Sequence, residues 1–121
     1  MPYETLGCWN DTIPRVLPTL EGNSKVSFVL DGNYKTRENV VQKCYEAANS
    51  QGMEYFAVQD GGQCFGSPVY SSSSYMSIGK STACLNGAGG PMANEVYKTV
   101  DGKCCINMRF FSALDEYYIG F

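Results

Sequence analysis

The 121-residue sequence contains no histidine. Histidine is the side chain that most often acts as a general base near neutral pH, so serine–histidine and cysteine–histidine mechanisms are impossible in this chain. A pair of carboxylates can also perform acid–base chemistry, but nothing marks out two of the 12 acidic residues for that role. We therefore predict that the protein is not an enzyme and needs no cofactor.

Metal-binding patterns are missing as well. Zinc sites usually combine cysteine with histidine or use CxxC pairs, and EF-hand-like calcium loops need regularly spaced acidic residues. Neither pattern occurs, and Asp31, Asp60 and Asp101 each precede a glycine, which is typical of turns. We expect no metal site.

Long apolar runs and basic clusters are also absent. No apolar run approaches the roughly 20 residues that a membrane-spanning helix needs. The nine basic residues are scattered and the net charge is −3, so the concentrated basic surface typical of nucleic-acid binding is missing. We expect neither membrane insertion nor a nucleic-acid partner.

What the sequence does contain is six cysteines, in a short chain rich in glycine and serine. An even number of cysteines in such a chain indicates a disulfide framework, and hence an extracellular location, secreted or on the cell surface. The sequon Asn10-Asp11-Thr12 agrees with that location and makes Asn10 a candidate glycosylation site. The length suits a single domain over residues 1–121.

The clearest helical pattern covers residues 37–50. We expect an N-cap at Thr36 and a left-handed glycine at Gly52 just beyond the end of the helix. The apolar residues that recur on one face of this helix are Val40, Val41, Cys44, Ala47 and Ala48.

Short strand patterns surround the helix. Residues 1–22 contain Pro14 and Pro18, which forbid a helix and predict an edge strand followed by a loop. Asp60-Gly61-Gly62 and Asp101-Gly102 are hairpin turns between strands. The other predicted strands are residues 25–30, 55–59, 63–65, 95–100 and 103–111. The fold class is therefore α+β: a small disulfide-braced domain with one main helix packed on a twisted antiparallel sheet.

Several segments resemble the WSC domain, an extracellular module loosely related to PAN/apple domains. Residues 6–11 (LGCWND) resemble its "GCY-D" opening, and residues 52–64 (GMEYFAVQDGGQC) resemble its "GY-YFGLQ-GGEC" segment. The closing "GGP…VY" is similar to residues 89–91 followed by residues 96–97. The resemblance covers about residues 6–97 and extends to a reduced-cysteine variant found in multidomain proteins of marine invertebrates. Residues 98–121 form an extension beyond it.

The resemblance implies the disulfides Cys8–Cys84 and Cys44–Cys64. Each bridge would contribute roughly 2–4 kcal/mol to the stability of a small domain. WSC domains usually carry eight cysteines, and the positions of one further pair are occupied here by Ala48 and Gly66. Both partners of that pair are therefore missing together, which leaves no unpaired thiol behind.

The adjacent Cys104 and Cys105 fall outside the resemblance. Neighbouring residues in a strand point to opposite faces, so each cysteine would need a different partner, one within the chain and one in another molecule. The alternative is a disulfide between the two, which requires a strained turn. The sequence leaves this choice open.

The resemblance also implies a non-catalytic recognition module whose partner is a glycan or an extracellular glycoprotein. Aromatic rings stack on the apolar face of a pyranose, while amides and carboxylates bond its hydroxyl groups. Alternatively, Trp9 packs over a disulfide in the core and Asp60 caps a turn. The candidate ligand-binding residues are Trp9, Asn10, Asp11, Gln59, Asp60, Gln63, Tyr70 and Tyr75.

The C-terminal extension suggests a second function. The predicted strand 103–111 is apolar on both faces, and residues 117–121 (YYIGF) are largely aromatic. Strand edges of that kind pair readily with neighbouring chains. The alternative hypothesis is therefore a self-associating structural protein, a homo-oligomer or filament locked by intermolecular disulfides. The two functions are compatible.

Overall fold

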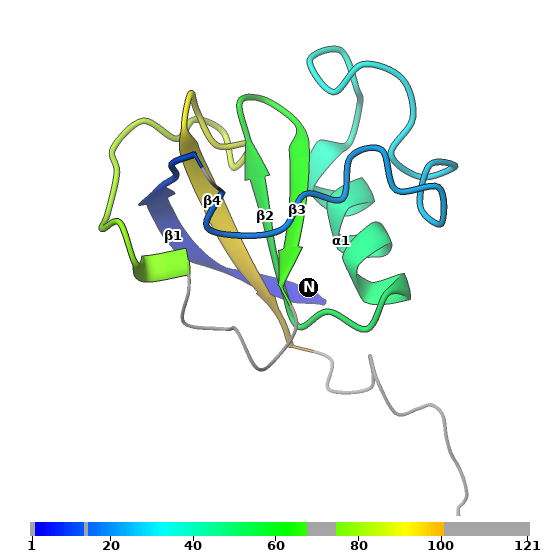
Figure 1. The fold of residues 1–121 in the computed structure, drawn as a ribbon, viewed down its shortest axis with the longest axis horizontal. Helices are drawn as coiled ribbons and strands as arrows, with labels where there is room; N and C mark the ends of the chain where they lie inside the picture. Colours follow the sequence, from blue (N-terminus) through cyan, green and yellow to red (C-terminus); the bar gives the residue numbers. More distant parts are fainter. Residues whose placement is uncertain (1, 14, 68–74, 101–121) are drawn as a thin grey trace, which may run out of the picture.

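The computed structural model of the protein describes residues 2–13, 15–67 and 75–100. It contains one helix and a four-stranded antiparallel sheet braced by two disulfides, which confirms the predicted α+β class (Figure 1). In chain order the elements are β1 (Tyr3–Asn10), α1 (Val40–Ser50), β2 (Tyr55–Gln59), β3 (Gln63–Ser67) and β4 (Ala93–Thr99).

The strand order of the sheet is β1-β4-β2-β3, so the first strand and the last described strand are neighbours (Figure 1). β1 is an edge strand, as predicted. Its pairing with β4 shifts register between Thr5 and Gly7, which marks a bulge. Gly7 has a φ of 100°, which a residue with a side chain rarely adopts.

The β2–β3 hairpin confirms the predicted pair of strands and its turn. β2 has the predicted bounds, and β3 extends to Ser67 instead of ending at residue 65. Glycine is required at Gly62, because a Cβ there would lie 2.3 Å from the carbonyl oxygen of Tyr34. The close approach of these two backbones holds the loop before α1 against the hairpin.

The predicted start of the helix is wrong. α1 begins at Val40, and the residue before it, Asn39, is left-handed with a φ of 53°. The hydroxyl of Thr36 donates to the carbonyl of Asn33 instead of capping the helix. The predicted end is confirmed, since Gly52 has a φ of 71° and donates its N–H to the carbonyl of Asn49.

The strand predicted for residues 25–30 is wrong. This segment forms consecutive turns, in which the N–H groups of Val29 and Leu30 both donate to the carbonyl of Val26. The edge of the sheet at β3 is not available to it, because residues 18–20 occupy the outer edge of that strand: the N–H of Gly66 donates to the carbonyl of Pro18. Val26 and Leu30 are buried all the same, whereas Phe28 is 78% exposed.

The predicted hairpin of residues 95–100 and 103–111 is only partly described. Its first strand is β4, which begins two residues earlier, at Ala93. Within the described residues, β4 lies between β1 and β2 and pairs with both strands. The predicted second strand lies outside the described residues.

The sheet has a buried core on each face. The helix-side core contains Phe56, Val58, Cys44, Cys64 and Tyr97, together with Leu20, Val26, Leu30, Ala47 and Ala48. The core on the opposite face is smaller, and consists of Leu17, Ala57, Phe65 and Val96. The segment that follows β1 supplies Leu17 and runs across this second face (Figure 1).

Candidate functional site

The polar candidate residues gather at one end of the sheet. Asn10 and Asp11 stand where β1 ends, Gln59 and Asp60 where β2 ends, and Gln63 where β3 begins. The antiparallel order of the strands produces this convergence. These side chains differ, however, in whether their polar atoms already form hydrogen bonds within the protein.

Asp11 and Gln59 belong to a strand-end network with Arg15 and Asn94. The Asp11 side chain is fully buried, and its carboxylate accepts from Arg15 Nη1 at 3.1 Å and from Gln59 Nε2 at 2.7 Å. It also accepts two backbone N–H groups of the following segment. Gln59 donates to Asn94 Oδ1 at 2.9 Å and accepts from Arg15 at 3.2 Å. The network therefore anchors the segment after β1 to the sheet.

Asp60 is the acidic candidate that reaches the surface. It is left-handed, with a φ of 53°, in the turn between β2 and β3. Hydrogen bonds from Lys35 Nζ and the Tyr34 hydroxyl, both at 3.0 Å, lower the pKa of its carboxyl. Asp60 borders a hollow of about 370 Å³ whose other lining residues include Gly61, Leu85, Asn86 and Pro91.

Asn10 and Gln63 are half-buried. The side-chain nitrogen of Asn10, which would carry a glycan, donates to the carbonyl of Lys80 at 2.9 Å. Gln63 pairs with Gln59 across the hairpin. Tyr70 lies outside the described residues.

Two aromatic candidates, Trp9 and Tyr75, meet a third ring, Tyr55, on the face opposite α1, and we call Trp9, Tyr75 and Tyr55 the aromatic row. The centroids of Trp9 and Tyr75 are 5.4 Å apart with the rings edge to face, and those of Tyr75 and Tyr55 are 6.0 Å apart with the rings stacked. All three side chains are half-buried. The indole nitrogen of Trp9 donates to the carbonyl of Leu6 at 3.0 Å, which fixes the orientation of its ring.

Strand register explains the row. Trp9 pairs with Asn94 and Tyr55 pairs with Lys98, so β1 and β2 place both rings on the same face, with β4 between them. The buried Val96 of β4 belongs to the core that Trp9 and Tyr75 pack against. Trp9 thus packs against a core, but the buried residues of that core include no disulfide, contrary to the interpretation that placed Trp9 over one. Part of the Trp9 surface stays open to solvent.

Two lysines flank the aromatic row. Lys80 Nζ lies 5.5 Å from the centroid of the Trp9 ring, and Lys98 Nζ lies 5.9 Å from that of Tyr55. Lys98 is also 3.8 Å from the carboxylate of Glu54. Tyr55 and the two lysines were not among the predicted ligand-binding residues. Tyr55 could have been identified from the sequence, because side chains alternate between the two faces of a strand and Tyr55 therefore lies on the face opposite Phe56.

Both disulfides implied by the resemblance are present. Cys44–Cys64 joins α1 to β3, and Cys8–Cys84 joins β1 to the segment that follows Lys80. Residues 79–81 run along the outer edge of β1: Asn10 N–H donates to the carbonyl of Gly79. These contacts place Lys80 beside Trp9. Cys104 and Cys105 lie outside the described residues.

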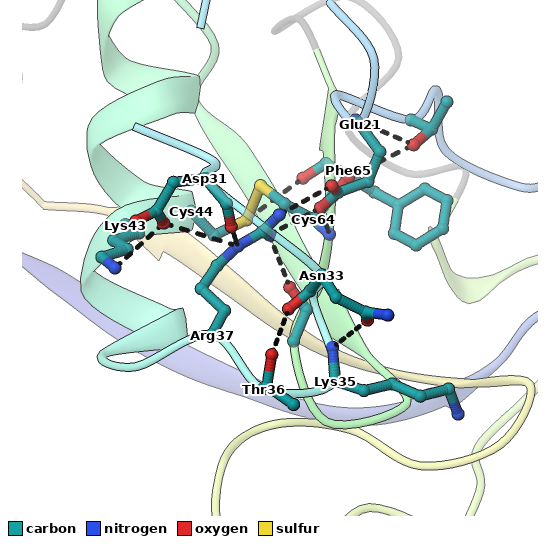
Figure 2. Close-up of polar contacts among 12 residues, drawn as sticks. Glu21, Asp31, Asn33, Lys35, Thr36, Arg37, Lys43, Cys44, Cys64 and Phe65 are labelled. Carbon is teal, nitrogen blue, oxygen red and sulfur yellow. Dashed lines mark hydrogen bonds and ion pairs between the residues drawn. A yellow bond between two sulfur atoms is a disulfide. The ribbon is translucent and has the colours of Figure 1, made fainter. Parts of the chain in front are cut away.

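A second polar cluster lies on the helix side of the sheet (Figure 2). The Arg37 side chain is 1% exposed and donates to both carboxylate oxygens of Glu21, at 2.8 and 3.0 Å. It also donates to the carbonyls of Asp31 and Gly62. Glu21 accepts the backbone N–H of Cys64 as well, at 2.9 Å. This cluster joins the loop before α1 to β3, and drawing Arg37 inward is incompatible with the helical start predicted there.

Within residues 2–13, 15–67 and 75–100, no group of three or more cysteine or acidic side chains is placed to hold a metal ion. In the same part of the chain, no helix has the length and apolar character needed to cross a membrane. A scan against protein-family models finds no match to this chain, and a search of curated proteins finds none either. The resemblance to the WSC domain therefore stays a hypothesis. Two disulfides are typical of extracellular proteins.

Proposed function

We propose that this protein is a non-catalytic extracellular recognition module that binds carbohydrate on the aromatic row. The observation that carries the proposal is the contact between Trp9, Tyr75 and Tyr55, three rings from distant parts of the chain on the sheet face opposite α1. Each ring is half-buried, so it is held in place while part of its surface faces solvent. Such a surface suits the apolar faces of linked pyranose rings.

Polar groups beside the row support the proposal. The ammonium groups of Lys80 and Lys98 lie over the terminal rings, the carboxylate of Glu54 lies beside Lys98, and all three can bond sugar hydroxyls. Asp11 and Gln59 have a different role, because their side chains bond within the strand-end network. The proposed ligand-binding set is thus narrower than the one the sequence suggested.

The resemblance to WSC domains supports the same proposal by analogy, since those modules are mostly regarded as carbohydrate-binding. This support rests on segments that the structure places in the sheet, namely β1, β2 with its hairpin, and β4.

Binding of the purified full-length chain to a glycan array tests the proposal. We expect Tyr75→Ala and Tyr55→Ala to weaken binding by about ten-fold each, which corresponds to about 1.4 kcal/mol. Tyr34→Ala is the matched control, because Tyr34 is also half-buried but bonds Asp60 away from the row. Absence of binding to every glycan at high density would contradict the proposal, as would an equal loss in the control.

Self-association remains a second proposal, and one observation favours it. Among the described residues, no strand lies on the outer side of residues 3–6 of β1, and an open edge can accept a strand from another chain. The N–H of Val100 donates to the carbonyl of Pro2, so β4 ends beside the start of that edge. Gel filtration of the full chain and of a chain ending at Thr99, with reducing and non-reducing gels, tests this. A monomer unaffected by the truncation would rule it out.

A further inference from the structure

A lysine stands at each end of the aromatic row. The order along the face is Lys80, Trp9, Tyr75, Tyr55 and Lys98, since each ring contacts the next and the two ammonium groups lie over the terminal rings. These cations come from separate segments, the loop beside β1 and strand β4. The surface that we propose for carbohydrate therefore carries a cation at each end, although the whole chain has a net charge of −3.

Lys80, like Lys25 but unlike Lys35, Lys43 and Lys98, has no ion-pair partner among the described residues. Lys35 pairs with Asp60 at 3.0 Å and Lys43 with Asp31 at 3.1 Å. Lys80 is exposed, and within the described residues no carboxylate lies at ion-pair distance from it. No carboxylate of the described residues therefore competes with an external anion for its positive charge.

The backbone of Lys80 is held in place although its side chain is exposed. Its carbonyl accepts from the Asn10 side chain at 2.9 Å, and it bridges to Trp9 on β1. The N–H of Ser81 donates to the carbonyl of Cys8, and the disulfide Cys8–Cys84 closes the same segment. The backbone of Lys80 thus has a fixed position beside Trp9, which limits the space that its side chain can reach to the vicinity of the aromatic row.

The two ends of the row are not equivalent. Lys98 has Glu54 at 3.8 Å, and its register partner on β1 is Glu4, so acidic groups already surround it. Arg15 lies over Phe65 on the same face but bonds Asp11 and Gln59 in the strand-end network. The Lys80 end of the row is therefore the better position for an anionic group of a ligand.

We infer that the aromatic row binds acidic saccharides in preference to neutral ones, with the carboxylate or sulfate of the sugar on Lys80 Nζ and a sugar ring against Tyr75 and Trp9. This inference rests on the proposed function and adds the chemical class of the ligand. Carboxylate and sulfate present the same anionic oxygens to an ammonium group, so the experiment includes both.

Soluble cellulose derivatives provide the test, because one linear chain with flat ring faces is available in neutral, carboxylated and sulfated forms. We measure binding of the full chain to hydroxyethyl cellulose, carboxymethyl cellulose and cellulose sulfate, with polyglutamate as a polyanion that lacks sugar. At least one charged cellulose should bind more tightly than the neutral form. Lys80→Gln should weaken that binding by about three- to five-fold, the size expected for one exposed ion pair.

Lys25→Gln is the matched control, since Lys25 is also exposed but precedes Val26 of the helix-side core. It should leave binding unchanged, and the melting temperature of each variant verifies folding. Equal binding of neutral and charged celluloses, or no effect of Lys80→Gln, would overturn the inference while leaving carbohydrate binding intact. Polyglutamate binding as strong as that of the charged celluloses, with no effect of Tyr75→Ala, would overturn both proposals.

Discussion

On its two faces the sheet is covered to different extents. On the side of α1, Phe56, Val58 and the disulfide Cys44–Cys64 are fully buried, and even the charged Arg37 is enclosed. On the other side, Leu17 covers Phe65 and Val96, but the aromatic row stays half-exposed. The same strands thus support one closed face and one open face.

This difference separates stability from recognition. Fully burying a large apolar side chain contributes about 1.5–3 kcal/mol to stability. Each ring of the aromatic row is only half-buried, so it contributes less than a fully buried ring would. A closed face alone would make the domain more stable but would leave no apolar surface for a ligand. Changes on the helix side should therefore alter stability first, and changes in the row should alter binding first.

The largest effect should come from the disulfide of the helix side. Cys44→Ala combined with Cys64→Ala removes a buried bridge between α1 and β3, and should lower the free energy of unfolding by about 4 kcal/mol. Denaturant unfolding measures this loss. Under conditions where the variant is still folded, its carbohydrate affinity should match that of the parent protein.

The variant without Cys8 and Cys84 tests instead the segment that carries Lys80 beside the aromatic row. It releases the segment that carries Lys80 from β1, so carbohydrate affinity should fall even where the protein remains folded. Equal losses of carbohydrate affinity in the two disulfide variants would mean that binding on the aromatic row also depends on the helix-side disulfide.

A smaller effect is expected from the buried ion pair. Arg37→Met leaves the Glu21 carboxylate without its cation and should cost about 2–3 kcal/mol, measured by denaturant unfolding. Adding Glu21→Gln should recover most of this loss, because the amide oxygen can still accept the N–H of Cys64. If the double variant were no more stable than Arg37→Met alone, the unpaired charge of Glu21 would not be the cause of the lost stability.

The smallest effect concerns Tyr97 and appears as a pH dependence. Burial, with smaller contributions from Glu95 and Tyr3, raises the pKa of Tyr97 from 10.0 to about 12. Because the folded-state pKa lies above the unfolded value, this stabilisation is complete below pH 10 and is lost as the pH rises through about 12.

Tyr97→Phe isolates this titration from those of the other tyrosines. At pH 8 the variant should be less stable by about 1 kcal/mol, because the 2.7 Å bond to the Gly87 carbonyl is lost. Between pH 10 and 12 the stability difference should shrink, as measured by urea unfolding at each pH. A constant difference across that range would contradict the assignment.

Local sequence signals were sufficient for much of the sheet and for the end of the helix. The short apolar run of β2, the glycines of its turn and the left-handed Gly52 each act within a few residues, so their outcome does not depend on the rest of the chain. The disulfides followed from the resemblance and not from local chemistry.

Tertiary structure decided the rest. Residues 25–30 alternate like a strand, but the outer edge of β3 is already occupied by residues 18–20, so they form turns. The helix starts late because Arg37 bonds Glu21 across the loop, a partner 16 residues away. The aromatic row depends on strand order, since only the placement of β4 between β1 and β2 sets Trp9 and Tyr55 on either side of Tyr75. Residue types and local periods are properties of the sequence itself, whereas edge occupancy, long-range ion pairs and the meeting of distant rings exist only once the chain has packed.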